Sequence, residues 1–205
     1  MATDFLLAVL SLAWGWILWR RGAQETSAAV LWWAGGFFAA AAAAAAGGTV
    51  HGFRRWLGTG GEAALWTASL YAIGFFAFCA TATAVTAGAP RSLHRPLLAG
   101  AVVLLAVYLV WTWTHDEFRY AVYAYGFAMA VLLAQQGLAW LRRRAPSAPW
   151  IAAGIAATAV GSAVQQAGID LHQRFNHNDL FHMIQICGGY LFYRGGRLLS
   201  PIRLS

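Results

Sequence analysis

Long apolar runs, broken by short polar or charged clusters, dominate this chain. A helix that spans a membrane needs roughly 20 mostly apolar residues. The apolar runs predict helices over residues 4–19, 27–52, 62–87, 96–114, 118–140, 148–169 and 178–199. The pattern therefore predicts an all-α bundle of seven transmembrane helices. Because the predicted loops are short, residues 1–205 are expected to form one domain.

The composition supports this prediction and excludes two classes of protein. Hydrophobic residues make up 60% of the chain and charged residues only 10%, which is typical of an integral membrane protein in a lipid bilayer. The net charge of +7 comes from arginines placed singly or in small groups beside apolar segments, so it reflects topology rather than a nucleic-acid partner. The chain has no lysine, which excludes a retinal protein that needs a lysine Schiff base. The oligomeric state stays open.

The arginines lie mostly on one side of the predicted bundle. Ten of the fourteen follow odd-numbered segments, and the other four are Arg54, Arg55, Arg119 and Arg174. By the positive-inside rule, the amino terminus faces outward and the carboxyl terminus lies in the cytoplasm. The lysine-free, alanine-rich and arginine-rich composition is consistent with a high-GC bacterium. We therefore expect a bacterial inner-membrane protein whose outward face is periplasmic.

Ionisable residues gather at the outward mouth of the last predicted helix. The stretch 170–185 contains three histidines and two aspartates, and ionisable residues within a membrane usually mark a functional site. The second predicted helix ends on the same side at His51, and the third begins there at Glu62. If the second and seventh helices are neighbours, His51, His177 and His182 can converge. His172 is expected to be a loop residue outside this group.

Three imidazoles at one membrane face suit zinc, because catalytic zinc sites use three protein ligands and keep one position for water. Zinc lowers the pKa of that water and makes it a nucleophile. The predicted ligands are His51, His177 and His182, with His177 able to join only if it precedes the helix and bends back. Glu62 and Asp170 are the candidate catalytic acids that would move the proton, and Asp170 can instead orient a ligand histidine.

These residues resemble the membrane hydrolase superfamily that includes alkaline ceramidases and the progestin and adipoQ receptors. The resemblance covers His51, Glu62, His177 and His182, and the sequence from Leu180 to Tyr193 is similar to the last-helix signature of the family. It implies seven helices, a zinc ion held by the histidines, and hydrolysis of a lipid amide by a metal-activated water. The expected substrate is a membrane lipid. The residues themselves would suit an ester equally well.

The chain departs from the family pattern at three positions. The family spaces its last two histidines four apart, which here places Asn178 rather than His177 before His182. The family serine would fall at Gly47, and Thr49 or Ser69 could take its role. Glu62 stands where the family usually has aspartate.

The same residues are also consistent with two other classes of function. The missing serine favours a receptor or scaffold with a structural metal site and no turnover. His51 and His182 could also be axial ligands of a haem in an electron carrier.

Overall fold

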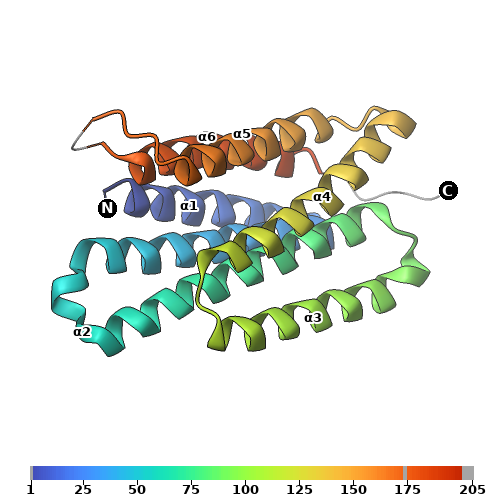
Figure 1. The fold of residues 1–205 in the computed structure, drawn as a ribbon. Helices are drawn as coiled ribbons and strands as arrows, with labels where there is room; N and C mark the ends of the chain where they lie inside the picture. The colour runs from blue at the N-terminus through green and yellow to red at the C-terminus, as the bar shows by residue number, and fades with distance from the viewer. Residues whose placement is uncertain (1, 173–174, 200–205) are drawn as a thin grey trace.

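A computed structural model describes residues 2–172 and 175–199 (Figure 1). This part of the chain folds into α-helices joined by short loops. The helices are α1 (Ala2–Gln24), α2 (Ala28–Gly88), α3 (Arg91–Thr114), α4 (Phe118–Arg143), α5 (Ala148–Gln166) and α6 (His177–Gly196). An isolated β-bridge joins His172 and Phe175 in the loop before α6. The all-α prediction is confirmed.

The helix α2 doubles back on itself at Gly58 (Figure 1). Gly58 has φ 63° and ψ 171°, a left-handed backbone that glycine adopts without a steric penalty. The predicted segments 27–52 and 62–87 thus become two arms, residues 28–57 and 59–88, which run in opposite directions. The expected loop over residues 53–61 was wrong, because the chain stays helical on both sides of this single glycine.

A stripe of small residues lets α1 pack closely against α2 and α6. The buried positions of α1 recur every third or fourth residue: Asp4, Ala8, Ser11, Gly15, Leu18 and Gly22. A Cβ atom built on Gly15 would lie only 3.1 Å from Phe37 Cβ, so a larger residue would push the helices apart. Small residues are the usual means of close helix packing in membranes. This packing brings the start of α1 beside α2 and α6.

One end of the bundle is tightly filled, and we call it the packed end. Its centre is Trp33, which is 1% exposed and whose indole Nε1 donates a hydrogen bond to the Phe192 carbonyl at 3.0 Å. A Cβ on Gly154 would lie 2.5 Å from Phe192 Cδ1, so glycine is required for α5 and α6 to approach. The packed end also includes Leu18, Val30, Ala34, Phe37, Ala80, Ala84, Met129, Leu132, Ile151 and Leu199.

Large apolar side chains cover much of the outer surface. On α3, Val103, Val110 and Trp113 are 60%, 74% and 73% exposed. Within the described residues, α1 to α5 are each long and apolar enough to cross a membrane, whereas α6 is less apolar because it begins with histidine, asparagine and aspartate. Such a surface is compatible with an integral membrane protein, because lipid tails would cover it.

Candidate functional site

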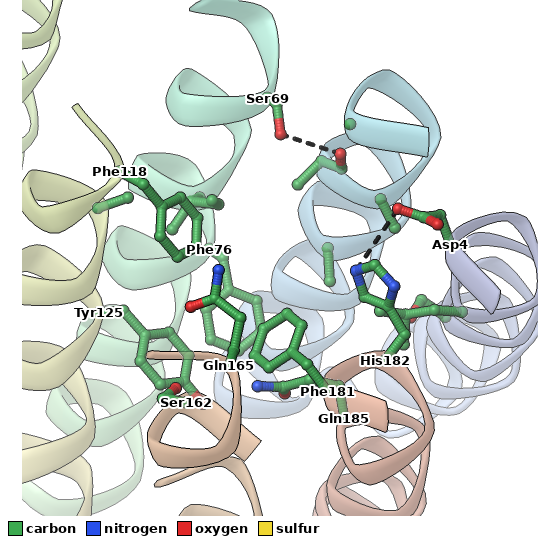
Figure 2. Close-up of a pocket in the computed structure, with 18 of the residues that line it drawn as sticks. Asp4, Ser69, Phe76, Phe118, Tyr125, Ser162, Gln165, Phe181, His182 and Gln185 are labelled. Atoms are coloured by element: carbon green, nitrogen blue, oxygen red, sulfur yellow. Dashed lines mark hydrogen bonds and ion pairs between the residues drawn. The ribbon is translucent and has the colours of Figure 1, made fainter. Parts of the chain in front are cut away.

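A cavity of about 290 Å³ extends from the packed end, where Phe37 and Phe192 line it, toward the end of the bundle that holds the start of α1. Figure 2 shows part of its lining. Residues of α1, both arms of α2, α4, α5 and α6 line it. Most of the lining is apolar, with aromatic rings from Phe37, Trp66, Phe76, Phe118, Tyr125, Phe181 and Phe192. The polar exceptions include Asp4, His51, Asn178 and His182, and these residues form the candidate site.

Asp4 and His182 form a buried pair at the edge of the cavity (Figure 2). The Asp4 Oδ1 atom lies 3.5 Å from His182 Nε2, and the two side chains are 3% and 12% exposed. Asp4 comes from the small-residue stripe of α1, and His182 lies in the second turn of α6. Gly48 makes room for the acid, because a Cβ there would stand 2.6 Å from Asp4 Cβ.

Thr3 and Asp179 hold the other nitrogen of the same ring. The Thr3 hydroxyl donates to Asp179 Oδ1 at 2.8 Å, and its oxygen lies 3.3 Å from His182 Nδ1. A hydroxyl has one proton to donate, so Thr3 must accept the second hydrogen bond from Nδ1–H. In the neutral ring the Nε2 lone pair then points toward Asp4. The geometry therefore fixes which nitrogen is available to take a proton.

His51 contributes a second imidazole to the cavity lining. It lies near the end of the first arm of α2, and its side chain is exposed. It is close enough to interact electrostatically with the His182 ring. The structure thus brings together His51 and His182, two of the three predicted zinc ligands.

His177 and Asp170 pair with each other and do not line the cavity. His177 is the first residue of α6, and both its backbone N–H and its Nδ1 contact Asp170 Oδ1, at 2.7 and 2.8 Å. Hydrogen bonds from the His177 side chain and backbone lower the pKa of the Asp170 carboxyl. This pair closes the loop between α5 and α6. His172 is exposed in that loop, and its backbone pairs with Phe175.

Glu62 also lies away from the cavity lining, in the turn region of α2. Its Oε1 pairs with Arg54 Nη2 at 2.6 Å across the bend at Gly58. The arginine side chain is 74% exposed, so the pair is solvated. An exposed ion pair of this kind adds little stability. In this position Glu62 pairs with Arg54 across the bend and does not reach the cavity lining.

The structure does not bring the three predicted zinc ligands together. Among residues 2–172 and 175–199, no group of three histidine, cysteine, aspartate or glutamate side chains could hold a metal ion. The reason is visible in the contacts of the predicted ligands. The His177 ring faces Asp170 and does not line the cavity, so only two of the three predicted ligands, His51 and His182, share it.

Ser69 occupies the space next to Gly47, where the family serine was expected. Its hydroxyl lies 3.5 Å from the position that a Gly47 Cβ would take, and it donates to the Ala43 carbonyl at 3.0 Å. Ser69 lines the cavity from the second arm of α2. Thr49 instead donates to the Ala45 carbonyl one turn earlier in its own helix.

Sequence reasoning missed Asp4 and Thr3 as site residues. Asp4 is not among the predicted site residues, because it stands at the start of an apolar segment. The signal that could have found it is the spacing of the small residues of α1, since Asp4 shares the stripe that packs inward. An acid on the buried stripe of an apolar helix is expected to have a partner.

Comparison with known proteins identifies the family of the chain. No curated protein and no solved structure matches it significantly. Residues 1–201 match a family of unknown function, DUF6962. Because the match covers nearly the whole sequence, the chain belongs to that family.

Proposed function

We propose that this protein is an integral-membrane hydrolase that cleaves an acyl amide or ester of a lipid. The observation that carries the proposal is the buried Asp4–His182 pair at the edge of an apolar cavity. An aliphatic chain suits the aromatic lining, and a carbonyl beside His182 would meet a base. The predicted resemblance to membrane hydrolases favours the amide.

His182 acts as the general base in this proposal. Its Nε2 takes a proton from a water molecule while the water oxygen adds to the acyl carbonyl carbon. Asp4 stabilises the imidazolium that forms, and the Thr3–Asp179 pair keeps Nδ1–H in place, as a third group orients the base in hydrolytic triads. The imidazolium then returns its proton to the leaving nitrogen or oxygen as the bond to carbon breaks. The products are a carboxylic acid and an amine or alcohol.

The negative charge on the carbonyl oxygen needs hydrogen-bond donors during this reaction. Asn178 lies one turn before His182 on α6, and both line the cavity. The Asn178 amide and a ring N–H of His51 are the donors that we assign to the oxyanion. Donors aimed at a developing charge in a dry site are often the largest single contribution to catalysis.

A zinc-dependent form of the same reaction is the second candidate. Asp4, His51 and His182 line one cavity and supply a carboxylate and two imidazoles, a donor set that catalytic zinc accepts. When bound, zinc would supply an activated water. In this set Asp4 takes the place of His177 as the third ligand. The His182 ring would have to give up its present contacts with Asp4 and Thr3 to bind the metal.

The proposed topology follows the sequence prediction. With the two arms of α2 counted separately, the helices would cross the membrane seven times. The arginine distribution favours an outward amino terminus, a cytoplasmic carboxyl terminus and a bacterial inner membrane. The cavity would then open toward the periplasmic face, near the start of α1.

The test uses purified full-length protein in lipid nanodiscs, with fluorogenic N-acyl and O-acyl amphiphiles as substrates. We expect turnover of at least one substrate, and a loss of roughly 10²-fold to 10⁴-fold in His182→Gln. His172→Gln, in the exposed loop, is the matched control and should keep full activity. Turnover that survives in His182→Gln would overturn the assignment, as would no turnover of either substrate class.

Elemental analysis of the same samples separates the two mechanisms. The metal-free mechanism predicts no stoichiometric zinc and full activity after chelation. Zinc at one ion per chain, lost together with activity in His51→Ala and Asp4→Ala, would favour the second candidate instead.

A further inference from the structure

Two glutamine side chains enter the cavity away from Asp4. Gln165 lies in the last turn of α5, and Gln185 lies on α6 three residues beyond His182. Figure 2 shows both carboxamides directed into the cavity, beside the rings of Phe76, Phe181 and Tyr125. Gln185 lies about 4.5 Å farther along the α6 axis than His182, from a rise of about 1.5 Å per residue.

Neither carboxamide has a hydrogen-bond partner among the described residues, whereas the polar groups around them do. Tyr125 Oη donates to Thr158 Oγ1 at 2.8 Å, and Ser162 Oγ donates to the Thr158 carbonyl at 3.0 Å. Both glutamines are half-buried, and their carboxamides reach the cavity rather than a protein partner. The two glutamines therefore offer donors and acceptors that a ligand can use.

The charge of the cavity restricts what this ligand can be. Within the described lining there is no arginine, and the chain has no lysine. Proteins bind phosphate groups mainly with arginine, lysine and backbone N–H groups. An uncharged group that both donates and accepts hydrogen bonds suits a pair of carboxamides best.

We propose that Gln165 and Gln185 form a binding site for a hydroxyl or amide group on an amphiphile whose hydrocarbon chain fills the aromatic part of the cavity. The identity of this amphiphile as a substrate rests on the proposed hydrolase function, but its binding does not. The glutamines then select neutral polar lipids over hydrocarbons and over phosphorylated lipids.

A competition assay tests this site without requiring turnover. The protein in nanodiscs is labelled with a photoreactive dodecanol probe. Four competitors are then compared for their ability to displace the probe: dodecanol, N-methyldodecanamide, dodecane and dodecyl phosphate. Wild type should prefer the alcohol and the amide to dodecane by about tenfold or more, from two hydrogen bonds of ordinary strength. Dodecyl phosphate should compete no better than dodecane.

The variant Gln165→Leu/Gln185→Leu should lose this preference. The control Gln166→Leu is matched in chemistry, but Gln166 is exposed and does not line the cavity, so its preference should be unchanged. If the double variant fails to fold, the single variants carry the test, each losing about half of the preference on a logarithmic scale. A preserved preference in the folded variants, or tight binding of dodecyl phosphate, would overturn the proposal.

The outcome can be separated from that of the hydrolase assay. Selective binding that depends on the glutamines, in a protein that hydrolyses no substrate, keeps this site and rejects the proposed reaction. Turnover that depends on His182 with no effect of the glutamines on binding does the reverse.

Discussion

The two ends of the bundle use similar residues for opposite purposes. At the packed end, glycines bring helices together until large side chains fill the space, as Gly154 does under Phe192. At the other end, aromatic rings stand around a cavity of about 290 Å³. A glycine there makes room for an acid, because a Cβ on Gly48 would lie 2.6 Å from Asp4 Cβ.

The contrast indicates that the packed end stabilises the fold, whereas the cavity end lowers its stability. Between apolar helices in a bilayer, packing and hydrogen bonds hold the fold because hydrophobic burial gives little drive to association. The packed end supplies that packing around Trp33, and it can therefore hold the helices while the other end keeps space open. A cavity and a buried carboxylate both reduce stability, which is expected of a functional site.

The largest effect that should distinguish the two ends is that of Asp4→Asn. This change keeps the shape of the side chain but removes the charge 3.5 Å from His182 Nε2. We expect turnover to fall by roughly 10²-fold or more, because the imidazolium loses its partner. The melting temperature in detergent should change little. An active Asp4→Asn protein would show that the pair is structural.

Trp33→Ala should have the opposite profile. In soluble proteins such a truncation costs about 3–5 kcal/mol. In a bilayer the packing part of this cost remains, so we expect a loss on the order of 2 kcal/mol. Equilibrium unfolding in mixed micelles measures the loss. The turnover number of the folded fraction should stay near that of wild type, and a selective loss of turnover would contradict the division into two ends.

Gly48→Ala tests a contact in which close helix packing positions a residue of the candidate site. The new Cβ would meet Asp4 Cβ at 2.6 Å, so the start of α1 must shift away from α2. A displacement of this size at a general base and its partner should lower turnover by about tenfold. Gly60→Ala is the matched control, because a Cβ there has nothing within 4 Å. Equal activities of the two variants would show that Gly48 is not needed to position Asp4.

Much of the fold could be predicted from the apolar runs, because each run of sufficient length has only one stable conformation in a bilayer. The turn at Gly58 could not, since a cluster of glycines is as typical of a loop as of a helical hairpin with one left-handed residue. The predicted convergence of His51 and His182 at one end agrees with the cavity lining.

The rest of the candidate site depends on packing that the sequence does not encode locally. The prediction assumed that the second and seventh predicted helices are neighbours, but α1 packs against both α2 and α6 and brings Asp4 to His182. His177 is instead held by Asp170, seven residues earlier, through a loop contact that helix periodicity does not predict.

The smallest expected effect concerns this loop contact, which lies near the cavity end but outside the cavity lining. Hydrogen bonds from His177 lower the pKa of Asp170 in the folded protein. The stabilisation is therefore complete above the unfolded pKa, about 3.9 for aspartate, and it is lost as the pH falls through the lower folded value. Amide exchange at His177, whose N–H donates to Asp170 Oδ1, should accelerate over that acidic range relative to its intrinsic rate.

Asp170→Asn should remove this pH dependence at His177 while turnover at neutral pH stays within a few-fold of wild type. The control Asp116→Asn lies in the loop between α3 and α4 and should leave the exchange profile of His177 unchanged. A large loss of turnover in Asp170→Asn would return this carboxylate to the catalytic role that the sequence predicted. The functional site would then include the loop between α5 and α6 as well as the cavity lining.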